Sequence, residues 1–121
     1  MDMTTQTDSI TALALTPSGD LIDVRLPREA DGTTLKGLYA TIDCREVDVV
    51  GLTSTLDMWL DGEGLINGTE VNWPATGLAG DYGFIWQSYA GTVVLASHDD
   101  EGGMVSLRPE QRAEIVKILR G

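Results

Sequence analysis

The stretch ITALALTPSGDLIDVRL, residues 10–26, decides the fold class because it holds two strand-like segments on either side of a turn. The first segment, ITALALT, carries apolar side chains on both of its alternating faces. In the second, LIDVRL, the apolar Ile22, Val24 and Leu26 alternate with charged side chains. The intervening PSGD is typical of a turn, so the stretch predicts an N-terminal β-hairpin.

The rest of the chain adds strands and helices to this hairpin. Alternating or β-branched patterns predict further strands over residues 42–50, 56–60, 82–86 and 92–96. Helices are predicted over residues 33–41, after Asn72 as an N-cap with Pro74 in the first turn, and over residues 108–120. In the last of these, one side is apolar: Ile115, Val116, Ile118 and Leu119.

Together these elements predict an α+β fold in one domain, residues 10–121, after a disordered leader of residues 1–9. The expected sheet has about five or six mostly antiparallel strands, accompanied by two or three helices. The C-terminal helix is expected to pack its apolar side on the sheet. A chain of 121 residues is long enough for one hydrophobic core.

The charge of the chain is strongly negative and unevenly distributed. Nineteen acidic residues against eight basic ones give a formal net charge of −11, and no Lys or Arg lies between Glu46 and Leu107. Such a surface repels a phosphate backbone, so we expect no direct binding of nucleic acid. It attracts a basic partner, or it serves solubility alone, and the sequence leaves both interpretations open.

Few residues in the sequence suit catalysis. Cys44 and His98 are the single cysteine and the single histidine, so no disulfide forms within the chain. Their pairing as a dyad is disfavoured because Cys44 has the alternation of a buried strand residue. The sequence contains no Gly-rich phosphate motif, and we therefore expect neither an enzyme nor a cofactor.

The best metal candidate is the segment HDDEGG, residues 98–103, which contains His98, Asp99, Asp100 and Glu101. Consecutive side chains do not readily all turn inward, and an acidic segment with two glycines is typical of a solvated loop. We therefore expect no metal site there. Its three carboxylates remain candidates for binding a partner.

Aromatic residues form the other group of candidates. Tyr82, Phe84 and Trp86 recur at every second position and would share one face of a strand, either as core beneath the C-terminal helix or as a binding surface. The stretch WLDGEGLINGTEVNWPAT, residues 59–76, has mainly turn and cap chemistry, with Gly62 and Gly64 able to take positive φ. Its expected binding residues are these: Trp59, Asp61, Glu63 and Trp73.

Membrane association is not expected. Residues 1–9, MDMTTQTDS, lack the basic start and apolar run of a signal peptide, and no apolar run approaches the roughly 20 residues that span a bilayer. We therefore expect a cytoplasmic protein.

Several short motifs resemble a small family of domains of unknown function found in phages, plasmids and other bacterial mobile elements. They are LDMWLDGEG (residues 56–64), Val71-Asn72 with Ala75, GTVVL (91–95) leading to DDEG (99–102), and Ser106-Leu107 with Glu110-Gln111. The similarity extends over residues 13–119. Family members typically have Asn in place of Asp61 and Ser or Thr in place of Arg108. The resemblance implies that the gene belongs to the accessory genes of mobile elements, where short acidic proteins often act on host proteins. It implies no particular activity.

Two functions are compatible with these patterns. The first is a non-enzymatic accessory protein that binds a basic host protein through an acidic face from Glu46 to Glu101, as in counter-defence or nucleic-acid mimicry. The alternative is a protein that binds a small, nucleotide-like molecule in an aromatic pocket. An anionic ligand would need basic residues, and the candidates are Arg25, Arg28, Lys36, Arg45 and those of the C-terminal helix. The oligomeric state stays open.

Overall fold

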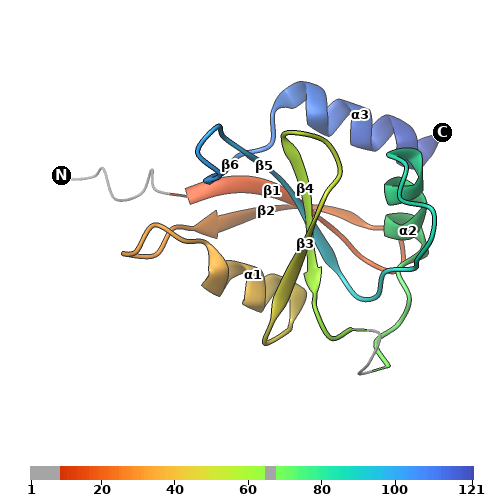
Figure 1. The fold of residues 1–121 in the computed structure, drawn as a ribbon, viewed down its shortest axis with the longest axis horizontal. Coiled ribbons are helices and arrows are strands. Elements are labelled where there is room, and N and C mark those ends of the chain that lie inside the picture. The colour runs from red at the N-terminus through yellow and green to blue at the C-terminus, as the bar shows by residue number, and fades with distance from the viewer. Residues whose placement is uncertain (1–8, 65–67) are drawn as a thin grey trace.

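The computed structural model describes residues 9–64 and 68–121, which form an antiparallel sheet with helices on both sides (Figure 1). The strands lie in the order β2-β1-β5-β4-β3, and β6 also pairs with β5. The strands are β1 Ser9–Leu15, β2 Leu21–Pro27, β3 Val47–Gly51, β4 Leu56–Asp61, β5 Val93–His98 and β6 Met104–Val105. The helices are α1 Leu35–Ile42, α2 Trp73–Asp81 and α3 Pro109–Arg120.

The N-terminal hairpin is confirmed. Strands β1 and β2 pair in register from Ser9 opposite Pro27 to Leu15 opposite Leu21. Gly19 takes a φ of 95° in the turn, a conformation that favours glycine. The predicted leader lies outside the described residues, except that its last residue, Ser9, already begins β1.

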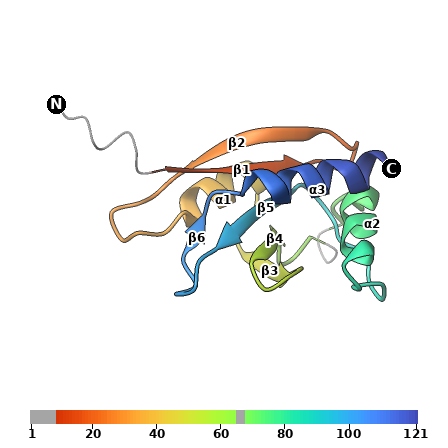
Figure 2. The same cartoon turned by 90° about the horizontal axis from the view of Figure 1, so that it is seen from above.

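The sheet separates two clusters of buried side chains. Central strand β5 contributes Leu95 to the first cluster and Val94 to the second, as the alternation of a strand requires. Ala79 of α2 and Ile115 of α3 belong to the first cluster, whereas Leu38 of α1 belongs to the second. Figures 1 and 2 show α3 and α1 on opposite sides of the sheet. The predicted α+β class and the packing of the C-terminal helix on the sheet are therefore confirmed.

Two strand predictions need correction. The predicted strand 42–50 begins only at Val47, because Ile42 still belongs to α1 and Asp43 ends that helix with a φ of 65°. Cys44 follows in the connection, so its predicted position as a buried strand residue is wrong. The backbone amide of Asp43 donates to the Tyr39 carbonyl at 2.8 Å, which closes the helix end.

The predicted strand 82–86 does not form. Helix α2 ends at Asp81, and Gly83 turns the chain with a φ of 100°. The amide of Phe84 then donates to the Ala79 carbonyl at 2.9 Å, which keeps the chain close to the helix end. Tyr82, Phe84 and Trp86 therefore do not form a row on one strand face.

The glycines that follow β4 also differ from the prediction. Neither Gly62 nor Gly64 has a positive φ. A side chain at Gly64 would lie 3.3 Å from both Cβ and the carbonyl oxygen of Ala90, so close packing is the reason for this glycine. Gly68, later in the same stretch, does take a φ of 74°.

Candidate functional site

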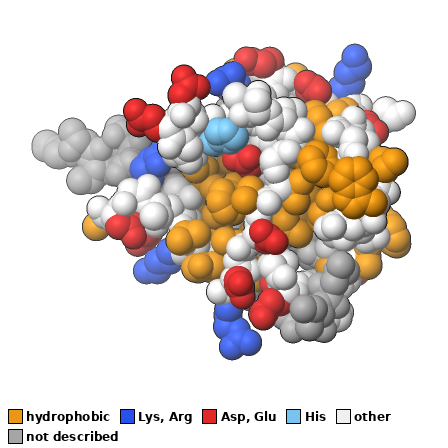
Figure 3. All heavy atoms as spheres, in the orientation of Figure 1, with side chains coloured by type: hydrophobic (Ala, Val, Ile, Leu, Met, Phe, Trp, Pro, Cys, Tyr) orange, Lys and Arg blue, Asp and Glu red, His pale blue; other side chains and the backbone are white. Residues whose placement is uncertain are grey.

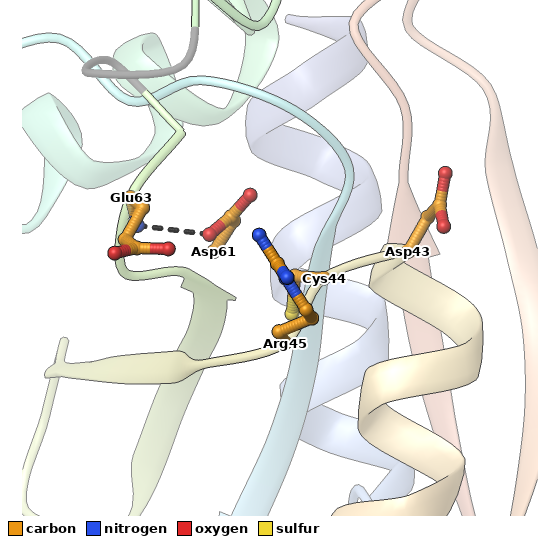
Figure 4. A pocket seen from close by; sticks show the side chains of 5 residues that line it. All are labelled: Asp43, Cys44, Arg45, Asp61 and Glu63. Carbon is orange, nitrogen blue, oxygen red and sulfur yellow. Dashed lines mark hydrogen bonds between the residues drawn. The ribbon is translucent and has the colours of Figure 1, made fainter.

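Asp61 lies at the meeting point of three shallow hollows at one end of the sheet. The first hollow is also lined by Asp43, Cys44, Arg45 and Glu63 (Figure 4). The second includes Asp48 and residues 87–90, and the third includes Asp43 and Glu70. We call the carboxylates around these hollows the Asp61 region: Asp43, Asp48, Asp61, Glu63 and Glu70.

The Asp61 region is strongly acidic and poorly suited to nucleophilic chemistry. Asp61 Oδ1 accepts a hydrogen bond from the Glu63 amide at 2.8 Å, which fixes the turn after β4. Burial, followed by the negative charge of Asp61, raises the pKa of the Cys44 thiol. A thiol with a raised pKa stays protonated and is a weak nucleophile near neutral pH. The carboxylates of the region favour binding of a cationic group, although Arg45 also lines the first hollow.

An exposed apolar patch lies next to the Asp61 region. Trp73, Ile85 and Trp86 leave 66%, 79% and 73% of their surface exposed, and we call these three residues the apolar patch. Trp73 and Gly80 share one face of α2, and a side chain at Gly80 would come within 3.9 Å of Ile85. Figure 3 shows hydrophobic side chains gathered over α2 and the segment that follows it.

The segment after α2 connects the patch to the acidic hollows. It returns along the helix, because the Tyr89 amide donates to Thr76 Oγ1 at 3.0 Å and the Asn72 amide donates to the Tyr89 carbonyl at 2.7 Å. Gln87 and Ser88, directly after Trp86, line the hollow that also contains Asp48 and Asp61. An apolar surface and an acidic rim are thus continuous.

The three predicted aromatics have different roles. Tyr82 and Phe84 are partly buried against the first core cluster, so they serve mainly as scaffold. Trp86 is exposed and has its ring centroid 5.9 Å from that of Phe84. Of the row proposed from sequence, Trp86 alone presents most of its surface to solvent. Ile85, its exposed neighbour, was missed because the strand pattern placed it on the opposite face.

The carboxylates of residues 99–101 lie apart from the Asp61 region. Strands β4 and β5 are antiparallel, with Leu56 opposite Ser97 and Trp59 opposite Val94, so Asp61 and Asp99 lie at opposite ends of the pair. Asp99 Oδ1 accepts from the amides of Glu101 and Gly103 at 3.0 and 2.8 Å. The acidic stretch from Glu46 to Glu101 is therefore not one continuous face.

His98 pairs with a carboxylate of the neighbouring strand. Its Nδ1 lies 2.7 Å from Oδ2 of Asp57, and both side chains are partly buried. The hydrogen bond and charge of Asp57 raise the pKa of His98. Asp100 and Glu101, next along the chain, are exposed. Within residues 9–64 and 68–121, no three His, Cys, Asp or Glu side chains are grouped so that they could hold a metal ion.

Trp59 lies on the sheet face opposite the first core cluster, partly buried beside Met104 in the second. It lines a separate hollow with Arg28, Leu35 and Met104. Its indole nitrogen is shielded from solvent and has no acceptor among the described residues. The sequence could not place Arg28 or Met104 there, because they are far from Trp59 along the chain.

Comparison with protein families adds one finding. A family model described as Domain of unknown function (DUF3846) matches residues 10–120, nearly the whole chain. The chain belongs to the DUF3846 family. Comparisons of this DUF3846 protein with curated proteins and with solved structures gave no match. The match extends over one continuous segment of domain length, and the description of the family assigns no activity.

Helix length bears on membrane association. None of the helices in the described part of this DUF3846 protein is long and apolar enough to cross a bilayer.

Proposed function

We propose that this DUF3846 protein is a non-enzymatic accessory protein of a phage or mobile element that binds a basic host protein in the cytoplasm. The binding surface consists of the apolar patch together with the Asp61 region. The observation that carries the proposal is the exposure of Trp73, Ile85 and Trp86 beside a hollow lined by Asp48 and Asp61. The mobile-element setting rests on the resemblance described for the sequence motifs.

The apolar patch has the composition of a binding hot spot. Tryptophan is enriched among residues whose truncation costs most in protein interfaces, and large exposed apolar groups mark interaction sites. Solvent exposure of two tryptophans and an isoleucine is unfavourable for an isolated protein, whereas burial against a partner removes this apolar surface from water. The patch therefore supports a partner with an apolar contact surface.

The Asp61 region supplies the charge that selects among partners. Gln87 and Ser88, directly after Trp86, line the same hollow as Asp48 and Asp61, so a partner that covers Trp86 would bring its rim close to these two carboxylates. Complementary charge raises the association rate and excludes partners of like charge. A formal net charge of −11 extends the same preference over long range at low salt. The region therefore supports a basic partner and disfavours nucleic acid.

The test compares capture of bacterial proteins by four immobilised forms of the chain. Wild type is set against Trp73→Ser/Trp86→Ser and against Asp48→Lys/Glu63→Lys. The matched control is Asp100→Lys/Glu101→Lys, which makes the same change in net charge at the opposite end of β5. Asp48, Asp100 and Glu101 are exposed and Glu63 is partly exposed, so these substitutions leave the core intact. For a basic protein that binds wild type at about 50 mM salt, the dissociation constant with each form is then measured by titration calorimetry.

The expected result is a dissociation constant at least about tenfold weaker for both the tryptophan and the Asp48/Glu63 variants. The Asp100/Glu101 control is expected to bind within about threefold of wild type, since rim charges away from the interface contribute little. Raising salt should weaken wild-type binding and affect the Asp48/Glu63 variant less. If the two charge-reversal variants weakened binding equally, net charge alone would account for the interaction. That result would contradict the proposed surface.

A further inference from the structure

The two outer strands of the sheet, β2 and β3, differ in how their edges are covered. On β3, the Glu46 carbonyl faces β4 and accepts from the Gly62 amide at 2.8 Å, so the alternation of the backbone turns the Val49 amide away from β4. There the Val49 amide donates to Oδ1 of Asp48 at 2.9 Å. A side chain of β3 itself therefore occupies part of the outer edge of that strand.

Strand β2 presents a longer and more regular edge, and Figure 2 shows it along the rim of the molecule. It pairs with β1 over its whole length without a bulge. On β1, the Thr11 carbonyl accepts from the Leu107 amide and so faces away from β2, and the backbone of Arg25, opposite Thr11, points out of the sheet. The same alternation turns the backbones of Leu21 and Asp23 outward. In the described part of the chain, these outward backbone groups have no hydrogen-bond partner.

The sequence of β2 is complementary to itself in antiparallel pairing. Pairing centred on Val24, the midpoint of the strand, puts Asp23 of each copy opposite Arg25 of the other. Both positions have outward backbones, so the two residues of each pair exchange backbone hydrogen bonds. Sliding one strand by two residues would put Asp23 opposite Asp23 or Arg25 opposite Arg25, and like charges in direct opposition are destabilising. The charges therefore select the register that uses the whole strand.

The two charged side chains keep capacity for this contact. Arg112 donates to both carboxylate oxygens of Asp23, at 3.2 and 3.0 Å, and Nη1 of Arg25 donates to Ser9 Oγ at 3.2 Å. An ionised carboxylate has roughly four acceptor sites, and a guanidinium has five donors in general. Arg25 of a second copy would therefore extend the existing ion pair and leave the bond to Arg112 in place.

Apolar side chains on the other face of β2 add to the complementarity. Ile22 leaves 48% of its surface exposed, and Val24 is only partly buried against the second core cluster. In the same register, Val24 lies opposite Val24 of the second copy, and Ile22 lies opposite Leu26. Pairing therefore removes part of this apolar surface from water.

We propose that two copies of the chain associate through β2 into one continuous antiparallel sheet with twofold symmetry. An interface of this symmetry uses the same surface on both copies, as the Asp23–Arg25 pairing does. Because β3 lies at the opposite edge of the sheet, Asp48 stays outside the interface. The dimer presents the Asp61 region twice, and a partner with two matching surfaces would bind it more tightly than one copy.

The test measures self-association of the full chain by sedimentation equilibrium at about 150 mM salt, which screens the repulsion between two acidic copies beyond about 8 Å. Wild type is expected to sediment as a dimer. Arg25→Asp puts like charges opposite each other in both pairs and should weaken dimerisation at least about tenfold. Asp23→Arg/Arg25→Asp exchanges the charges and should dimerise within about threefold of wild type. The control Arg45→Asp makes the same change in net charge outside β2 and should leave dimerisation unchanged. All three positions are exposed, so the variants should fold.

Amide hydrogen exchange locates the interface on the chain. The amides of Leu21, Asp23 and Arg25 should exchange slowly in the wild-type dimer, whereas the remaining amides at positions 21 and 23 should exchange faster in Arg25→Asp. Wild type that stays monomeric at millimolar concentration would overturn the proposal. A dimer that persists in Arg25→Asp but is lost in Trp73→Ser/Trp86→Ser would overturn it too, by placing self-association at the apolar patch. If exchanging the charges did not restore the dimer, the proposed register would be wrong. None of these results depends on the proposed host partner.

Discussion

His98 Nδ1 lies 2.7 Å from Asp57 Oδ2, which joins the end of β5 to the neighbouring strand β4 through two side chains on the same sheet face. The hydrogen bond to Asp57 is the main cause of the raised pKa of His98, followed by the charge of Asp57. The backbone of Ser54 and the charge of Asp99 act in the same direction. The pair therefore stabilises the protonated imidazole in the folded protein.

This pair predicts how stability depends on pH. The folded-state pKa of His98 exceeds its ordinary value of 6.5, so its contribution to stability is fully present below about pH 6.5 and is lost as the pH rises through the folded pKa. Urea unfolding of wild type should show a decline across that window, and Asp57→Asn should show a smaller one. His98→Gln removes the titrating group and should abolish this part of the pH dependence. If stability declined with pH in His98→Gln as steeply as in wild type, other titrating groups would be the cause of the decline.

Asn72 is predicted to be one of the most sensitive polar positions. The buried side chain accepts from the Ala75 amide at 2.9 Å and donates to the carbonyls of Leu15 and Gly91 at 3.0 and 2.8 Å. Asn72→Ala loses the helix cap and leaves two buried carbonyls without this donor, for an expected loss of about 2–4 kcal/mol in the free energy of unfolding. Chemical denaturation measures it.

Asn72→Asp tests the helix cap separately from the two hydrogen bonds that the Asn72 side chain donates. The carboxylate keeps an acceptor for the Ala75 amide, but it faces the carbonyl oxygens of Leu15 and Gly91 with negative charge in a buried position. We expect a loss at least as large as that of Asn72→Ala. Near-wild-type stability of Asn72→Asp would mean that the cap alone matters.

Local sequence patterns were sufficient to predict several helices and strands. The hairpin follows from alternation and a turn, α3 follows from Pro109 and its apolar side, and the start of α2 follows from Asn72 and Pro74. In each case the side chain that directs the backbone lies within a few residues of the backbone it directs. The sequence therefore contains the whole signal in one short segment.

The errors have a common physical origin in tertiary packing. The aromatic alternation of residues 82–86 suits a strand, but Gly83 turns the chain back along α2 and its contacts with that helix replace sheet pairing. The linear run of acidic residues suggested one face, yet the antiparallel pairing of β4 and β5 puts Asp61 and Asp99 at opposite ends. The hollow at Trp59 needs Arg28 and Met104, which only the folded sheet brings together.

The tryptophans predict a simple fluorescence result. Trp73 and Trp86 are exposed, whereas Trp59 is partly buried in the second core cluster. The double variant Trp73→Phe/Trp86→Phe should therefore emit at shorter wavelength than wild type and be less accessible to acrylamide, an uncharged quencher that the acidic surface does not repel. Trp59→Phe should change both quantities in the opposite direction. Equal quenching of the two variants would contradict the exposed patch.

Ile115 is predicted to anchor α3. It is fully buried in the first cluster, whereas Ile118 of the same helix is only partly buried against it. Ile115→Ala should lower the free energy of unfolding by about 2–5 kcal/mol through lost burial and the cavity left behind. Ile118→Ala, the same change on the same helix, should cost less in chemical denaturation. The reverse order would place the main contact of α3 elsewhere.

Tyr82 connects the segment after α2 to α3 and should ionise unusually late. Burial is the main cause that raises its pKa from 10.0 to about 12, and the negative charge of Glu114, 3.2 Å from the phenol oxygen, adds to it. The contribution of this group to stability is therefore present below about pH 10 and lost as the pH rises through about 12. Tyr82→Phe should remove an ionisation near pH 12 from the phenolate absorbance titration.

Substitutions on α3 test the cause of this late ionisation. Glu114→Gln should lower the pKa of Tyr82 while leaving it above its ordinary value, because burial, the larger cause, persists. Glu110→Gln removes a charge one turn earlier on the same helix, and it should leave the titration unchanged because Glu110 is not among the groups that raise this pKa. Equal effects of the two substitutions would indicate that the overall negative charge raises the pKa, and the contact between Tyr82 and Glu114 would then have no specific role.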